Sequence, residues 1–183
     1  MARWRRDLFF YVSTMDKGNF VFFSLLGAIG VLFCSFGYFA YTNHVRIAFE
    51  QQRRADLICL ATNIYFEARG EPTAGQHAVA EVTLNRVASQ RFPGTVCEVV
   101  YEKRWDRRRK RYIGAFSWTE LESTSRPKGV AWQRAVAAAQ TIYDSQQAPT
   151  VQGALFYHAD SIEPRWAKTK KQVAKIGRHI FYL

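Results

Sequence analysis

The sequence holds few of the residues that metal sites and covalent cross-links require. It has four histidines and three cysteines among 183 residues. The histidines form neither an H-E-x-x-H pattern nor a comparable ligand cluster, which argues against a zinc-dependent enzyme. We therefore expect no metal and no cofactor, and we expect structural roles for most of the histidines, which are His44, His77, His158 and His179.

The three cysteines leave one question of pairing open. Cys34 lies inside an apolar segment, whereas Cys59 and Cys97 lie in the more polar remainder of the chain. That pair fits a single disulfide if the domain occupies an oxidising compartment, and it fits two free core thiols equally well in the cytosol. The choice between these compartments depends on whether the apolar segment is a membrane segment that carries the domain out of the cytosol.

Charged residues are absent from residues 18–43. The run from Phe20 to Tyr41 reads FVFFSLLGAIGVLFCSFGYFAY, and about 20 helical residues span the hydrocarbon core of a membrane. A buried helix of a soluble domain is one alternative, but such a helix rarely runs this long without a polar face. A cleaved signal peptide is another, but its apolar run is about 7 to 15 residues long, and no clear A-x-A site follows here. We expect an uncleaved, single-pass signal anchor.

Basic residues on both sides of this segment bear on its orientation. Arg3, Arg5, Arg6 and Lys17 favour a cytoplasmic N-terminus, although basic residues that follow the segment weaken the contrast: Arg46, Arg53 and Arg54. We expect a cytoplasmic segment at 1–17, a membrane anchor at 18–43, a stalk at 44–55 and one domain at 56–183. That domain would lie in the periplasm, or otherwise outside the inner membrane.

The net charge favours a polyanionic partner. There are 26 Lys and Arg residues against 15 Asp and Glu residues, a formal net charge of +11. Nucleic acid, anionic lipid and an acidic wall polymer all fit such a charge, which can also serve solubility alone. Arg107–Arg111, RRRKR, resembles a nucleic-acid patch. Beside a membrane anchor we expect wall polymer or lipid head groups instead, or a solvated loop, and no nucleic acid.

Beyond residue 55 the pattern indicates an α+β domain that is mainly helical, with a small β element. Helical spacing of apolar residues predicts helices over 56–66, 73–87 and 131–143. Gly70 and Pro72 end the first of these. Aromatic-rich runs at 154–158 and 179–183 predict short strands. We expect residues 103–112, KRWDRRRKRY, to form a basic loop.

Glu67 is the strongest candidate for a catalytic acid. It closes an apolar helix beside Tyr65 and Phe66 in IYFEARGEPTAGQHAVAEVTLNRV. Desolvation against aromatic side chains raises the pKa of a carboxyl group, and a carboxylic acid protonated near neutral pH can donate to the leaving oxygen of a glycosidic bond. From spacing alone Glu67 could equally cap the helix or pair with Arg69 or Arg86.

This segment resembles the signature of the cell wall hydrolase family typified by the spore-cortex-lytic enzyme SleB. The similarity continues in the expected order from Asp56 to Leu183, through FPGTVCEVVYE, FSW, ALFYHA, PRWA and IGRHIFY. The resemblance implies a lysozyme-like, lytic-transglycosylase-like domain that acts between N-acetylmuramic acid and N-acetylglucosamine of peptidoglycan. It assigns the essential acid to Glu67, which would protonate the glycosidic oxygen and then deprotonate the muramic acid 6-hydroxyl. Cys59 and Cys97 match positions found in many members, which implies a disulfide.

Two departures from the family pattern concern substrate positioning. Gly114 and Ala115 precede Phe116 where members often carry Cys-Gln, and Thr119 follows Trp118 where another cysteine is common. The polar contact of that glutamine and a second disulfide are therefore absent. The expected effect is on activity more than on the fold.

Further candidates for substrate binding are aromatic or polar. Aromatic side chains can stack on sugar rings, with ordinary core packing as the alternative, and polar ones can hydrogen-bond N-acetyl groups, with helix capping as the alternative for Asn85. The candidates are Tyr65, Arg69, Glu71, Gln76, Asn85, Phe116, Ser117, Trp118, Tyr157, His158 and Trp166.

Other functions compete with glycan cleavage. An N-acetylmuramoyl amidase would release stem peptides, and a wall-binding or scaffold protein with a decayed site would release nothing. Small residues such as Gly27, Gly30 and Gly37 make the anchor weakly hydrophobic, as in phage endolysins with releasable signal anchors. The pattern indicates nothing about oligomeric state.

Overall fold

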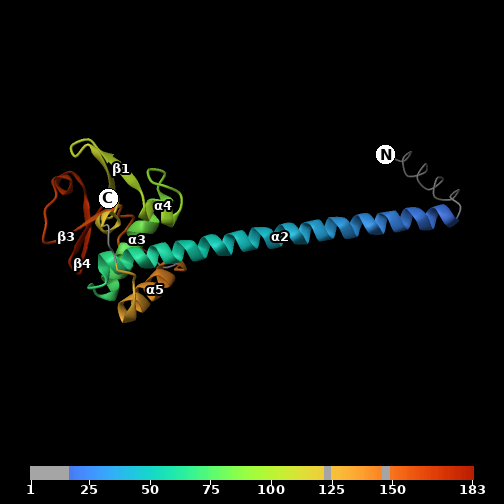
Figure 1. The fold of residues 1–183 in the computed structure, drawn as a ribbon, viewed down its shortest axis with the longest axis horizontal. Helices are drawn as coiled ribbons and strands as arrows, with labels where there is room; N and C mark the ends of the chain where they lie inside the picture. Colours follow the sequence, from blue (N-terminus) through green and yellow to red (C-terminus); the bar gives the residue numbers. More distant parts are fainter. Residues whose placement is uncertain (1–16, 122–124, 146–148) are drawn as a thin grey trace. The chain divides into compact units, whose positions relative to one another are not determined.

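The computed structural model describes residues 17–121, 125–145 and 149–183, and the basic residues Arg3, Arg5 and Arg6 lie outside these ranges. The chain divides into two compact units, Met1–Glu50 and Gln51–Leu183. Helix α2, Lys17–Ala68, contributes to both (Figure 1). It is long and apolar enough to cross a membrane, with a mean hydropathy of 2.2 in a window of which none is buried.

Helix α2 runs without interruption through the expected stalk. The helix expected over 56–66 is therefore the last part of α2 and not a separate element. No proline occurs between Lys17 and Ala68, so every backbone N–H beyond the first turn can join the helical ladder. The helix ends just before Gly70 and Pro72, where the sequence places its first strong breakers.

The helices of the second unit enclose one apolar cluster. They are α3 (Thr73–Ala88), α4 (Val96–Val100) and α5 (Gly129–Tyr143), with 3-10 turns at η1 (Ser117–Glu120) and η2 (Arg165–Thr169). Leu60 and Ile64 of α2 pack in this cluster with Val79 of α3 and with Ala135 and Ala139 of α5. Burial of one such leucine or isoleucine stabilises the fold by roughly 1.5 to 3 kcal/mol. A disulfide between Cys59 and Cys97 links α2 to α4.

A three-stranded antiparallel sheet forms the C-terminal part of this unit. Strands β3 (Phe156–Ala159), β5 (His179–Tyr182) and β4 (Gln172–Ile176) pair in the order β3-β5-β4. Phe181 of β5 joins Ala78 and Val82 of α3 in a second apolar cluster. The expected strands at 154–158 and 179–183 correspond to β3 and β5, but β4 was not anticipated.

The expected basic loop at 103–112 is wrong, because this segment belongs to a β-hairpin. Strand β1 (Lys103–Asp106) pairs antiparallel with β2 (Arg111–Gly114), with Trp105 opposite Tyr112. Asp106 closes the turn, since its Oδ1 accepts hydrogen bonds from the backbone N–H groups of Arg108 and Arg109. The sequence did not predict the hairpin, because most of its side chains are exposed. The segment therefore lacks the alternation of apolar and polar residues that marks a half-buried strand.

Candidate active site

Glu67 and Tyr157 meet at the C-terminal end of α2. Glu67 is the penultimate residue of that helix, and the hydroxyl of Tyr157 on β3 donates a hydrogen bond to Glu67 Oε2 at 3.1 Å. Burial raises the pKa of Glu67 above its ordinary value, although the Tyr157 hydrogen bond and the positive charge of Arg86 both oppose the shift. The carboxyl group therefore keeps its proton to a higher pH than an exposed glutamate does.

Tyr157 serves this pair as a permanent donor. Burial raises the pKa of the Tyr157 hydroxyl well above 10, and the adjacent charge of Glu67 raises it further. The hydroxyl therefore stays protonated at any physiological pH. Its hydrogen bond fixes one oxygen of Glu67 and leaves Oε1 with no protein donor among the residues that the structure describes.

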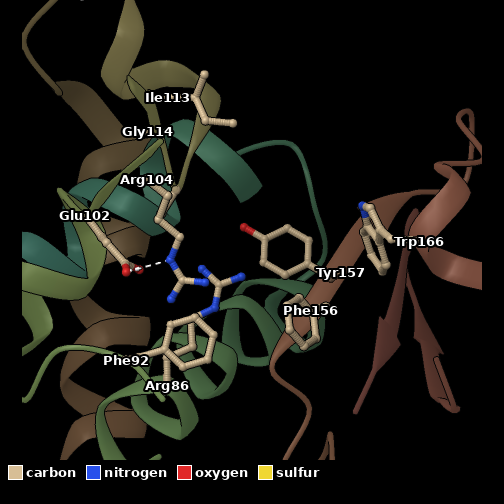
Figure 2. Close-up of a pocket in the computed structure, with 10 residues that line it drawn as sticks. Arg86, Phe92, Glu102, Arg104, Ile113, Gly114, Phe156, Tyr157 and Trp166 are labelled. Carbon is tan, nitrogen blue, oxygen red and sulfur yellow. Dashed lines mark hydrogen bonds and ion pairs between the residues drawn. The ribbon is translucent and has the colours of Figure 1, made fainter. Parts of the chain in front are cut away.

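Tyr157 also lines a pocket of about 310 Å³ (Figure 2). Three groups of side chains form it with Tyr157. Aromatic walls come from Phe92, Phe156 and Trp166, the charged groups are Arg86, Glu102 and Arg104, and the hairpin side is formed by Ile113, Gly114 and Ala115. Glu67 is not among the lining residues, and the Tyr157 hydroxyl connects its carboxyl group with the wall of this pocket.

Arg86 is the most deeply buried charge at this pocket. Its side chain comes from α3, its residue is 8% exposed, and its Nε donates to the carbonyl of Leu155 at 2.9 Å. The guanidinium lies over the rings of Phe92 and Phe116, at 5.4 and 5.1 Å from their centroids. Burial lowers the pKa of Arg86, and the negative charges of Glu102 and Glu67 work in the opposite direction.

Arg104 approaches the same pocket from β1. Its Nε donates to Glu102 Oε1 at 2.6 Å, and its guanidinium lies 4.6 Å from the centroid of Phe92. Sequence reasoning missed Arg86, Phe92, Glu102, Arg104 and Phe156 as site residues. All of these except Arg104 stand inside segments that carry the family resemblance, and this was the available signal. Nothing in the sequence pattern showed that Arg86 or Arg104 would face a cavity.

Of the residues expected to bind substrate, Tyr157 and Trp166 line this pocket, whereas Tyr65 and Trp118 pack in the core. Tyr65 is 7% exposed and contacts the ring of Trp132 edge-on. Trp118 is 8% exposed, stacks on Phe66, and donates from Nε1 to Asn63 Oδ1 at 3.0 Å. The aromatic surface of the pocket thus comes mainly from the C-terminal half of the chain.

Phe116, Ser117 and Arg69 have different surroundings. Phe116 is 3% exposed and supports the guanidinium of Arg86 from below the pocket surface. Ser117 is exposed at the start of η1. Arg69 is exposed, and its guanidinium lies 5.1 Å from the ring centroid of Tyr65. None of the three lines the pocket that Tyr157 forms.

Glu71 and Gln76 hold the turn that follows α2. Both Glu71 oxygens accept hydrogen bonds from Arg178, one from its backbone N–H at 2.9 Å and one from its Nε at 2.8 Å. Burial alone would raise the pKa of Glu71, but these two hydrogen bonds lower it below the ordinary value. Gln76 Nε2 donates to the Glu71 carbonyl at 3.1 Å. The arrangement joins the turn to the β4–β5 connection and keeps the Glu71 carboxylate charged.

Asn85 and His158 do not line this pocket, and both make hydrogen bonds between elements of the domain. Asn85 Nδ2 donates to the carbonyl of Ala154 at 3.1 Å, which ties α3 to the segment before β3. His158 Nε2 lies 2.9 Å from the Tyr182 hydroxyl, and the imidazole contacts the Trp166 ring edge-on. Within residues 17–121, 125–145 and 149–183, no three His, Cys, Asp or Glu side chains gather as a metal site would require.

The chain is similar to a known protein family and to several known proteins. The family model described as Cell Wall Hydrolase matches residues 70–182. The spore cortex-lytic enzyme of Bacillus cereus is 35% identical over 126 residues, covering 69% of this chain and 43% of the relative. The enzyme of the same description from Bacillus subtilis is 31% identical over 126 residues, covering 69% and 37%. The chain therefore spans less than half the length of these curated relatives.

One solved structure covers the same part of the chain. It is described as the catalytic domain of the germination-specific lytic transglycosylase SleB from Bacillus anthracis. It has 32% sequence identity and a TM-score of 0.52, and the match covers 70% of this chain and 93% of that chain. The second unit therefore has the fold of that domain, mostly helical with small sheets.

Proposed function

This chain belongs to the cell wall hydrolase family, and we propose that it is an enzyme that cleaves the glycan strand of peptidoglycan. The cleaved bond joins N-acetylmuramic acid to N-acetylglucosamine, and the reaction is that of a lytic transglycosylase with Glu67 as its catalytic carboxyl group. The observation that carries this proposal is the hydrogen bond between Glu67 and Tyr157 at the wall of the 310 Å³ pocket.

The first step requires a protonated Glu67. As the bond from C1 of muramic acid to the glycosidic oxygen breaks, Glu67 donates its proton to that oxygen, which leaves as the 4-hydroxyl of N-acetylglucosamine. The raised pKa of Glu67 supports this role, because the carboxyl group keeps its proton to a higher pH than an exposed glutamate does. Tyr157 then stabilises the resulting carboxylate, since its hydroxyl donates to Oε2.

In the second step the same carboxylate acts as a base. The 6-hydroxyl of muramic acid attacks C1, its proton passes to Glu67, and a 1,6-anhydro ring forms. Glu67 ends the cycle protonated, and no water molecule is consumed. This balance requires no second protein carboxylate as nucleophile. The engagement of both Glu71 oxygens by Arg178 supports a structural role for that neighbour.

The same proposal includes a membrane anchor at residues 18–43, with the domain on the outer side of the inner membrane. The apolar window of α2 supports it by length and composition. The Cys59–Cys97 disulfide supports an oxidising compartment, where such bonds persist. A domain tethered in this way would meet a thin wall lying close to the membrane.

The test is a digest of purified sacculi by the full chain in detergent, with Glu67→Gln and Glu163→Gln in parallel. Glu163 is a matched control, because its side chain is exposed and pairs only with the exposed Lys168 among the described residues. Mass spectrometry should find anhydro-muramic ends from the wild type and Glu163→Gln, and at least about a hundredfold less from Glu67→Gln.

Other products would change the assignment. Reducing muramic acid ends would retain Glu67 as the acid but replace transglycosylation with hydrolysis. Free stem peptides would favour the amidase. Intact sacculi after incubation with a folded wild type would favour a wall-binding or scaffold protein.

A further inference from the structure

The pocket that Tyr157 lines contains a buried guanidinium with unused donors. An arginine side chain carries five N–H donors. Among the residues that the structure describes, Arg86 uses one of them, the Nε that donates to Leu155. Its guanidinium also lies over two aromatic rings. These rings attract its positive charge but do not replace directed hydrogen bonds to its N–H groups. A residue that is 92% removed from solvent therefore keeps its terminal nitrogens available at a cavity.

A second guanidinium lies next to the first. Figure 2 shows the groups of Arg86 and Arg104 side by side above Phe92, and both lie within 5.4 Å of the centroid of that ring. Two like charges brought together at a partly desolvated site repel each other. Glu102 offsets one of them, because its Oε1 accepts from Arg104 Nε at 2.6 Å. The charged side chains that line the pocket are two arginines and one glutamate, so the lining carries one excess positive charge.

Glu102 serves the pocket as the ion-pair partner of Arg104. Its Oε2 is buried and has no hydrogen-bond partner among the described residues. Because this oxygen is buried, a ligand in the cavity does not reach it. The pocket therefore offers guanidinium N–H groups to an acceptor. An uncharged chain of N-acetylglucosamine would leave the excess positive charge unpaired.

We propose that Arg86 and Arg104 form a subsite for a carboxylate carried by the muramic acid residue of the strand, with Glu102 holding the Arg104 guanidinium in place through Oε1. This inference rests on the proposed function and deepens it. Guanidinium groups bind carboxylates through paired, charge-assisted hydrogen bonds, and the planar fork matches the two oxygens. The subsite would distinguish muramic acid from N-acetylglucosamine and so select which glycosidic bond lies beside Glu67.

Muramic acid offers this carboxylate from two sources. Its 3-O-lactyl group ends in a free carboxylate on a strand without stem peptides. On a strand with stem peptides the lactyl carboxyl is an amide, and the peptide itself carries carboxylates. Both sources present the same chemistry to the two arginines, so binding experiments must compare them.

The experiment measures strand binding by the full-length Glu67→Gln chain in detergent, which separates binding from cleavage. Four ligands are compared by calorimetry: glycan strands without peptides, strands with peptides, and each of these after conversion of its carboxylates to methylamides. We expect at least one acid form to bind roughly tenfold or more tightly than its methylamide, as charge-assisted hydrogen bonds predict. A preference confined to the peptide-free strand identifies the lactyl group, and one confined to the peptide-bearing strand identifies the peptide.

Two further variants separate the subsite from the overall positive charge. Arg104→Gln, added to Glu67→Gln, should abolish most of the preference for the acid form. Arg107→Gln on the same hairpin removes the same charge from a side chain outside the pocket lining and should retain it. Equal binding of acid and methylamide forms, an unchanged preference in Arg104→Gln, or an equal loss in Arg107→Gln would each overturn the subsite.

These outcomes are distinct from failure of the proposed function. Tight, acid-dependent binding by a chain whose wild type releases no product supports the subsite and removes the enzymatic proposal. Equal cleavage of acid and methylamide strands retains the enzyme and removes the subsite. Binding to none of the four ligands removes the subsite, and the products of the sacculus digest decide the enzymatic proposal separately.

Discussion

The Tyr157 hydroxyl reaches Glu67 Oε2 at 3.1 Å across a sequence separation of 90 residues. The contact joins the last turn of α2 to strand β3, so it forms only when the sheet packs against the helices. It gives the carboxyl group a fixed orientation and a donor that stays protonated. The proposed acid is therefore assembled by tertiary structure, and its chemistry depends on a side chain that local sequence does not supply.

Replacement of Tyr157 by Phe should change the pH dependence of cleavage. The hydrogen bond from Tyr157 lowers the pKa of Glu67, so its removal should raise that pKa further. Activity that needs the protonated acid is lost as pH rises through this pKa, and the falling limb of kcat/KM should move to higher pH. The maximal rate should also fall, roughly tenfold, because one hydrogen bond to the carboxylate is lost. Tyr112→Phe on the exposed face of the hairpin is the control, and an unmoved limb in Tyr157→Phe would remove Tyr157 from the mechanism.

Replacement of Glu67 by Gln should stabilise the fold while it abolishes activity. A carboxyl group whose pKa is raised by folding is bound to its proton more tightly in the folded state than in the unfolded one. The destabilisation that the ionised Glu67 carboxylate causes is absent below the pKa that Glu67 has in the unfolded chain. It grows as pH rises above that value and is complete above the pKa of Glu67 in the folded protein. The Tm gain of Glu67→Gln should therefore be larger at pH 8 than at pH 4. Thermal unfolding followed by tryptophan fluorescence measures it, and a gain that is larger at pH 4 would contradict the direction of the shift.

The sequence predicted the helical frame well, because its signals are local. The expected helix at 73–87 corresponds to α3 at Thr73–Ala88, and that at 131–143 to α5 at Gly129–Tyr143, each with an apolar face and a breaker nearby. The hairpin of β1 and β2 and the strand β4 were missed. Their side chains are mostly exposed or partly buried, so hydrophobic alternation is weak.

The candidate site was predictable only in part. Glu67 and Tyr157 stand in strong motifs, and a hydrogen bond joins them in the folded domain. Arg86 could not be distinguished from a solvated or capping arginine near the end of a helix, because only its burial against Phe92 and Phe116 shows its role. Tyr65 and Trp118 stand in equally strong motifs but pack in the core. Motifs contain most of the residues that line the pocket but not Arg104, and tertiary packing decides which motif residues face the cavity.

Reduction of the Cys59–Cys97 disulfide should destabilise the domain without a direct effect on chemistry. The bond closes a loop with a sequence separation of 38 between α2 and α4. The loss of that constraint on the unfolded chain should cost roughly 3 to 4 kcal/mol. Denaturant unfolding of Cys59→Ser/Cys97→Ser against the wild type measures the cost. Cys34→Ser is the control, because Cys34 is an exposed free thiol, and its midpoint should match that of the wild type.

Replacement of Glu71 by Ala should separate a structural carboxylate from a catalytic one. Glu71 accepts from the backbone N–H and the Nε of Arg178, so truncation leaves the backbone donor without its partner and should cost about 1 to 3 kcal/mol of stability. Because those hydrogen bonds lower the pKa of Glu71, its contribution is present above the unfolded pKa and is lost as pH falls through the folded one. The difference in Tm between wild type and Glu71→Ala should therefore shrink below about pH 4. The kcat of the folded variant at 25 °C should stay within about threefold of the wild type, whereas a loss as large as that of Glu67→Gln would make Glu71 a second catalytic carboxylate and replace the single-acid mechanism.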